Sequence, residues 1–203
     1  MKSDFDLNRQ NQSTESKIIA SLERIAQAFR VLLWQESKEY ALSPIQIQLL
    51  IFLHFHSEEK RKVSYLANEF NMSKATISET VKTMEQKELI VKAYDPADTR
   101  SYTIHLTEKG RDLAEKTSGF TREIRVPVDQ LNPDDKENLL LSLLSIIRHL
   151  NQTQIITVQR MCMSCSHYKT DKKGEHFCSL LNQKLNASDL RIDCPDHELK
   201  AES

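Results

Sequence analysis

The sequence predicts a mainly α-helical protein of the α+β class, with one β-hairpin and a small cysteine-rich tail. Three observations support this fold class. Long apolar stripes with helical spacing stand on both sides of the middle of the chain. Between them, short helical segments are followed by two alternating runs typical of strands. All four cysteines fall within the last 42 of the 203 residues.

The first predicted element is a long helix near the N-terminus. Its apolar residues recur at alternating steps of four and three, which places them on one stripe of a helix. They are Ile18, Leu22, Ile25, Phe29 and Leu32. Such a stripe packs either on its own domain or on a second copy of the chain.

Two helices separated by a tight turn are expected next. Ser43 before Pro44 opens a helix, because serine accepts free amide protons and proline suits the first helical position. A short helix over residues 63–70 then leads to Ser73, which caps a further helix ending near Leu89. The apolar residues of that last helix are expected to face inward: Ile77, Val81 and Met84.

A β-hairpin and two more helices complete the predicted body of the protein. Residues 89–94 and 102–106 alternate in polarity around a polar, turn-rich tip at 95–100, which indicates a hairpin. Thr107 caps the next helix, and Asn132 opens the last long one. That last helix carries a wide apolar stripe of Leu139, Leu140, Leu143, Leu144, Ile147 and Leu150.

This order of elements is that of a winged helix-turn-helix. In such a domain the second helix of the pair enters a major groove of DNA, and the hairpin tip reaches toward the adjacent minor groove. Small hydroxyls suit contacts with base edges, and lysines suit contacts with phosphates. The helix that begins at Ser73 presents such side chains opposite its apolar face. The candidate DNA-binding residues are Ser73, Lys74, Thr76, Ser78 and Lys82.

Several segments of the chain resemble the MarR family of bacterial regulators. They are 42–44 (Leu-Ser-Pro), 63–67 (Val-Ser-Tyr-Leu-Ala), 73–78 (Ser-Lys-Ala-Thr-Ile-Ser) and, most specifically, the wing and its continuation at 95–110. The resemblance covers about residues 15–160. It implies a homodimer whose first and last helices interlock and which binds a palindromic operator in double-stranded DNA. It also implies that Arg100 enters a minor groove and that Asp98 helps to hold the wing.

These signals divide the chain into four regions. They are an N-terminal dimerisation helix at 1–40, a winged helix-turn-helix DNA-binding domain at 41–128, a C-terminal dimerisation helix at 129–160 and a cysteine-rich metal-binding extension at 161–203. The formal net charge is −1, so any DNA binding must come from a local basic face.

The tail is a candidate metal centre. Cys162, Cys165, Cys178 and Cys194 have the spacing at which four thiolates surround one metal ion or cluster. Zinc would be structural, whereas an iron–sulfur cluster would make the tail a sensor. The spacing is similar to that of high-potential iron–sulfur proteins, although the tail lacks their tryptophan and glycine before the last cysteine. A metal-free dithiol switch is a third interpretation. Nearby histidines that could replace a cysteine are His167, His176 and His197.

Other features narrow the function. Three glycines cannot build a phosphate-binding loop, and no catalytic arrangement stands out, so we expect no enzyme activity. Without an apolar leader or a membrane-length run, a cytoplasmic protein is expected. The family's effector pocket falls near Trp34, Tyr40, His54 and His56, to which we assign no ligand role.

Three functions remain open. The first is a regulator whose DNA affinity responds to the tail's metal or redox state. The second is a regulator of small organic effectors with a purely structural zinc tail. The third is an electron-transfer or metal-handling protein that uses its winged helix for protein contacts.

Overall fold

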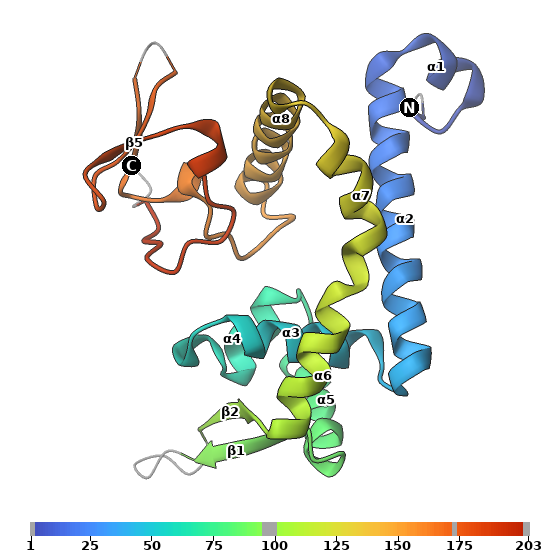
Figure 1. Ribbon diagram of the computed structural model, residues 1–203, viewed down its shortest axis with the longest axis vertical. Coiled ribbons are helices and arrows are strands. Elements are labelled where there is room, and N and C mark those ends of the chain that lie inside the picture. The colour runs from blue at the N-terminus through green and yellow to red at the C-terminus, as the bar shows by residue number, and fades with distance from the viewer. Residues whose placement is uncertain (1–2, 95–100, 172–173, 201–203) are drawn as a thin grey trace.

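The computed structural model describes residues 3–94, 101–171 and 174–200. Figure 1 shows a winged-helix body at one end, from which two long helical columns rise, and the tail with its neighbouring helix at the other end. This arrangement confirms the predicted mainly helical class with a small two-stranded sheet. Among the described residues, no helix combines the length and apolar content needed to cross a membrane.

The N-terminal column is a short helix, α1 (Leu7–Gln12), followed by the long helix α2 (Thr14–Tyr40). Ser13 caps α2, and Ala41 ends it in a left-handed conformation (φ 51°). Leu33 of α2 is buried in the winged-helix core. Much of the predicted stripe is not covered within the chain, and its exposed members are Ile18, Ile25 and Phe29.

The helix pair forms as predicted. Ser43 and Gln46 make a reciprocal capping box at the start of α3 (Pro44–Phe55). After a 3-10 turn, η1 (Glu58–Lys60), come α4 (Val63–Glu69) and α5 (Lys74–Gln86). Helix α5 stops three residues before the expected Leu89, because Glu88 adopts a left-handed φ of 60° that turns the chain toward the first strand.

Strands β1 (Ile90–Tyr94) and β2 (Tyr102–Leu106) pair antiparallel, with Ile90 opposite Leu106. The hairpin tip at 95–100 lies outside the described residues. The core beneath the hairpin is built mainly from α3, α4, α5 and β2, with contributions from α2 and α6. Its most deeply buried members are Ile47, Leu49, Leu50, Leu66, Ile77, Met84, Ile104 and Ala114, each 0% exposed.

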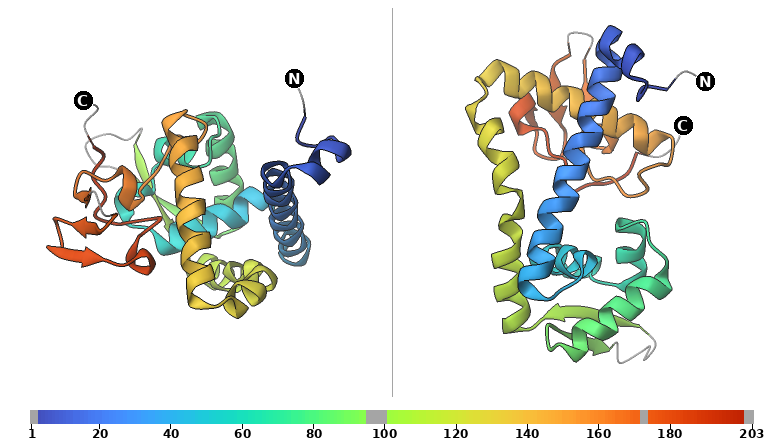
Figure 2. Two further views of the ribbon diagram at one scale, coloured as in Figure 1. Left: turned by 90° about the horizontal axis from the view of Figure 1, so that it is seen from above. Right: turned by 90° about the vertical axis from the view of Figure 1, so that its right-hand side faces the viewer.

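A second helical column runs back from the hairpin. It consists of α6 (Glu108–Ser118), capped by Thr107 as predicted, the 3-10 turn η2 (Gly119–Thr121) and α7 (Arg122–Gln130). It packs beside α2 (Figure 2). The rings of Phe29 and Phe120 meet edge to face between the two columns, 6.4 Å apart. Asn132 then caps α8 (Pro133–Gln152).

The tail is a small three-stranded antiparallel sheet with short 3-10 turns. Its elements in chain order are η3 (Cys162–Ser164), β3 (Tyr168–Thr170), β4 (His176–Cys178), β5 (Gln183–Leu185) and η4 (Ala187–Asp189). The tail lies against α8 (Figure 2). One apolar cluster joins Leu144 of α8 to Met161, Tyr168 and Leu190 of the tail. The tail therefore has a larger core than its own sequence indicated, because α8 supplies one side of it.

The start of α6 lies so close to the backbone of Leu89 that position 110 requires a glycine. A Cβ atom at Gly110 would lie 2.0 Å from the backbone oxygen of Leu89. Gly110→Ala should therefore lower the free energy of unfolding by about 1–3 kcal/mol, because backbone cannot give way as a side chain can. Chemical denaturation measures the change.

Gly119→Ala is the matched control. The nearest atom to a Cβ there is the mobile end of Arg122, at 3.4 Å. Its stability should stay within about 1 kcal/mol of the unsubstituted protein. Equal stability of the two variants would contradict the close helix–strand contact.

Candidate DNA-binding face and cysteine site

Helix α5 divides cleanly between a buried and an exposed face. Ile77, Val81 and Met84 are at most 1% exposed and fix the helix on the core. The predicted DNA-binding side chains are all exposed, and they are Ser73, Lys74, Thr76, Ser78 and Lys82. A surface of hydroxyls and cationic side chains on an anchored helix suits a DNA groove.

Not every predicted contact residue is equally free to reach DNA. The hydroxyl of Ser73 accepts the Thr76 amide proton at 3.0 Å and lies 2.8 Å from the Thr76 hydroxyl. Ser73 therefore acts first as the helix cap that places Thr76. The Lys82 ammonium lies 3.8 Å from Glu79, and both side chains are largely exposed, so this pair is weak.

The base of the wing is fixed to α5. Lys92 on β1 donates to Glu85 of α5 at 2.6 Å, and this hydrogen bond raises the pKa of Lys92. The Tyr94 and Tyr102 rings meet edge to face 5.6 Å apart. The wing tip with Asp98 and Arg100 lies outside the described residues, so the roles expected of these two residues stay predictions.

The fold brings all four cysteines to one cavity. Cys162, Cys165, Cys178 and Cys194 line a space of about 30 Å³, together with apolar side chains of the tail such as Tyr168. All four are free thiols. Burial raises the pKa of the Cys162 thiol, and the other three cysteines add to the rise. The spacing along the chain thus corresponds to proximity in space.

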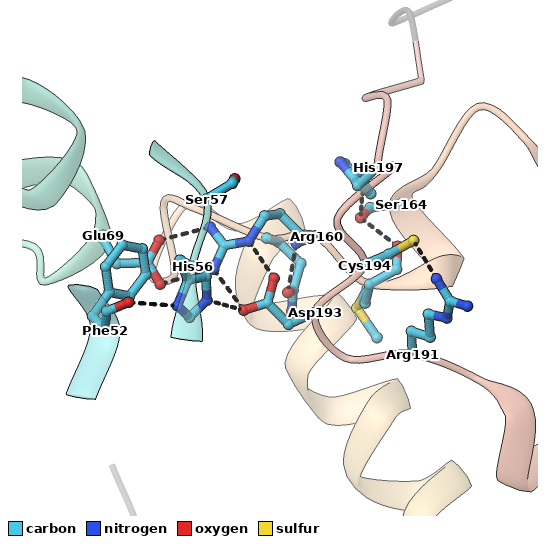
Figure 3. Close-up of polar contacts among 12 residues, drawn as sticks. Phe52, His56, Ser57, Glu69, Arg160, Ser164, Arg191, Asp193, Cys194 and His197 are labelled. Carbon is cyan, nitrogen blue, oxygen red and sulfur yellow. Dashed lines mark hydrogen bonds and ion pairs between the residues drawn. The ribbon is translucent and has the colours of Figure 1, made fainter. Parts of the chain in front are cut away.

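The surroundings of the thiols suit thiolate ligands. The backbone N–H of Arg191 donates to the Cys162 sulfur at 3.2 Å, and its guanidinium donates to the Cys194 sulfur at 3.4 Å (Figure 3). Hydrogen-bond donors of this kind stabilise the thiolate, which is the form of cysteine that binds metals. Over the described residues, however, no three or more Cys, His, Asp or Glu side chains stand in the close grouping of a preformed metal site.

The nearby histidines have other partners. His176 Nδ1 lies 2.6 Å from the Tyr168 hydroxyl, and His197 Nε2 lies 3.0 Å from the Ser164 hydroxyl. His167 lines the cysteine cavity, and its buried Nε2 makes no hydrogen bond among the described residues, although a Glu198 carboxylate oxygen lies 3.2 Å away. The contacts of His176 and His197 favour the four cysteines over these two histidines as ligands.

An ion-pair network that sequence reasoning missed joins the tail to the winged helix. Arg160 lies between Glu69 at the end of α4 and Asp193 of the tail (Figure 3). His56, after α3, lies 2.7 Å from the same Asp193 carboxylate. Hydrogen bonds from Arg160 hold the pKa of Asp193 well below its usual range. The only local hints are that Arg160 precedes Cys162 by two residues and that Asp193 directly precedes Cys194.

The residues near the expected effector pocket make separate contacts. Trp34 is 55% exposed on α2. His54 lies 3.7 Å from Glu115 of α6. His56 stacks on Phe52 with ring centroids 3.8 Å apart and takes part in the tail contact described above.

Comparison with known proteins agrees with this geometry. Residues 42–101, from the start of α3 to the wing, match the model of the MarR family. The matched segment is the one that carries the candidate DNA-binding face of α5.

One curated relative is an uncharacterized HTH-type transcriptional regulator, YkoM, of Bacillus subtilis (strain 168). It is 24% identical over 110 residues, which are 54% of this chain and 70% of the relative.

Solved structures show the same fold. The S. aureus MepR–DNA complex has a TM-score of 0.57 at 24% identity and covers 64% of this chain and 96% of MepR. Streptococcus pneumoniae FabT in complex with DNA has a TM-score of 0.59 at 17% identity and covers 68% of this chain and 99% of FabT. About a third of this chain thus lies outside each match, while the relatives are matched almost completely.

Proposed function

We propose that this protein is a homodimeric, sequence-specific DNA-binding transcriptional regulator whose DNA affinity depends on a metal centre at its four cysteines. The observation that carries the DNA-binding part is the anchored, exposed hydroxyl-and-lysine face of α5 beside a fixed wing, within the MarR-family segment. MepR and FabT, which share this fold, have been solved as DNA complexes. A palindromic operator follows from a two-fold symmetric dimer.

The dimer is supported by apolar side chains that one chain leaves uncovered. On α2, Ile18, Ile25 and Phe29 are between 38% and 50% exposed. On α8, Leu139 and Ile146 are exposed, while Leu144 packs on the tail. Such faces on two long helices suit burial against the same helices of a second copy.

The metal centre is supported by the convergence of four thiols and by the N–H donors of Arg191. Zinc would hold the loops of the tail together, and an iron–sulfur cluster would add a redox state. The packing of the tail on α8 also favours the alternative of a purely structural zinc clip, with a small organic effector as the input. A metal-dependent change in DNA affinity separates these two functions.

DNA binding is tested with two substitutions on an operator selected from random duplexes. Lys82→Ala should weaken specific and non-specific binding alike and reduce the salt dependence by about one phosphate contact. Arg100→Ala should cost about 1–3 kcal/mol of specific binding. Lys184→Ala, which removes an exposed charge from the tail, is the control and should bind like the unsubstituted protein. Unchanged affinity of both test variants would refute the proposed DNA face.

Assembly is tested by light scattering. The protein should have a mass of about 47 kDa, twice the 23.5 kDa of one chain. Ile25→Asp should weaken the dimer, because it places a charge in the proposed α2 interface. A monomer at micromolar concentration before any substitution would contradict the interface.

The metal centre is tested by anaerobic purification, an absorption spectrum and metal analysis. A cluster would give brown protein that bleaches on oxidation, and zinc would give colourless protein. Cys178→Ser should lower metal content sharply, because three ligands leave an open and labile site. His176→Asn, the control, should keep its metal, since His176 is engaged with Tyr168.

Full metal content in Cys178→Ser would instead assign a histidine as the fourth ligand. Metal-free protein that forms a disulfide in air would replace the metal centre with a dithiol switch.

A further inference from the structure

We infer that Arg160 is a positioning residue that couples the cysteine site to the helix-turn-helix. This inference rests on the proposed function, because it supplies the route by which the state of the tail reaches the DNA-binding helices. We call Arg160, Glu69, Asp193 and His56 the joint. It lies where the chain leaves α8 and enters the tail (Figure 3).

On the winged-helix side, Arg160 makes a forked contact with α4. Its two terminal nitrogens donate to the two Glu69 carboxylate oxygens at 2.7 and 3.1 Å. One of them also donates to the Tyr65 hydroxyl at 2.7 Å. The Arg160 side chain is 10% exposed and that of Glu69 18%. A forked and largely buried pair is directional, so it fixes the position of α4 more firmly than a surface ion pair would.

On the tail side, Arg160 is joined to the loop that carries the last cysteine. Its guanidinium donates to Asp193 through two nitrogens, one of them at 2.9 Å from Oδ2. Its backbone carbonyl accepts the Cys194 amide proton at 3.0 Å, and the Cys162 amide donates to Arg191 at 3.0 Å. Two of the four thiols therefore sit on backbone that is hydrogen-bonded at or beside the joint.

His56 adds a second connection to the winged helix. Its Nε2 lies 2.7 Å from Asp193, and its Nδ1 lies 3.0 Å from the Phe52 carbonyl oxygen of α3. Both partners are acceptors, so the two hydrogen bonds form together when both ring nitrogens carry protons. Asp193 thus contacts the end of α3 directly and the end of α4 through Arg160.

From α4 the route to the DNA-binding helix is short. Leu66 of α4 and Ile77 of α5 are both fully buried in the same core. The turn between the helices is held by the Met72 amide, which donates to Ala67 at 2.8 Å. A shift of α4 therefore changes the angle at which α5 is presented.

The consequence is a defined response to the cysteine site. Four ligands on one metal hold the Cys162 and Cys194 backbones together, and with them the position of Asp193. When the metal is lost, Asp193 is held only by Arg160 and His56, so the tail side of the joint loosens while the contacts of Arg160 with α4 remain. The metal-loaded and metal-free proteins then differ in the local stability of α4 and in DNA affinity.

The test measures amide hydrogen exchange of α4 in the full-length protein, loaded with metal and after chelation. Three single variants are compared: Glu69→Gln, Asp193→Asn and, as a control, Glu175→Gln. The control breaks the Lys184–Glu175 pair within the tail sheet, away from the joint. Metal content is measured on every sample, which tests the metal centre separately from the coupling.

We expect α4 amides of the unsubstituted protein to exchange about tenfold faster after chelation, the scale of one charged hydrogen bond. Glu69→Gln should exchange fast in both states, and Glu175→Gln should behave like the unsubstituted protein. Glu69→Gln should bind as much metal as the unsubstituted protein, since Glu69 lies on the winged helix and not in the cysteine site.

Two results would overturn the inference. Metal-loaded and metal-free protein with the same α4 exchange would refute the coupling and leave the metal centre standing. If no sample contains metal, the proposed metal centre is refuted. The role of the joint is then tested only by comparing α4 exchange in the variants with that in the unsubstituted protein. In that case Glu69→Gln and Asp193→Asn should still speed α4 exchange, and unchanged exchange in both would refute the joint.

Discussion

Burial of α3 is the constraint on which the winged helix depends. Ile47, Leu49, Leu50 and Leu53 of this helix are at most 1% exposed, and only the side with Gln48 and Phe55 is exposed. Each such side chain contributes about 1.5–3 kcal/mol relative to exposure. Helices α2, α5 and α6 and strand β2 all pack on α3. The polar outer face of α5 is a consequence, since its only apolar stripe is used on this core.

The second constraint is that α8 packs on the tail with one face and leaves apolar side chains exposed on another. Its stripe is wider than one neighbour can cover, and Leu144 is taken up by Met161, Cys165 and Tyr168 of the tail. Leu139 and Ile146 remain exposed. The tail is therefore attached to a helix whose other face is free for a partner chain, so the cysteine site lies close to the proposed dimer interface as well as to the winged helix.

What the sequence predicted correctly came from local signals. Helix starts at Ser43, Ser73, Thr107 and Asn132 follow from cap chemistry, and each of these side chains accepts an amide proton in the structure. Helix α7 was missed because Pro127 lies within it, and proline in a helical pattern indicates a break. The tail sheet was missed because strands of three residues carry too little alternation to detect.

Local sequence signals also explain why the cysteine site was predicted and the joint was not. Cysteine spacing indicates proximity because few residues separate Cys162 from Cys165, and the fold brings the other two to the same cavity. The joint could not be found this way. Arg160 and Glu69 are 91 positions apart, and His56 and Asp193 are 137 apart. Single charged residues of this kind resemble any surface residue until the fold brings them together.

The free energy that the joint must transmit to α4 is small compared with the free energy of metal binding. A ligand shifts an equilibrium only by the difference in its affinity for the two states. A tenfold change in DNA affinity needs about 1.4 kcal/mol. Structural zinc binding is worth about 10–16 kcal/mol in small domains, so only a minor share has to reach α4. Arg160 can carry that share because each end of its guanidinium meets a carboxylate on a different part of the fold. Loss of either carboxylate leaves a largely buried charge with half its partners, and in the proposed coupling this is how a local change at Cys194 displaces α4.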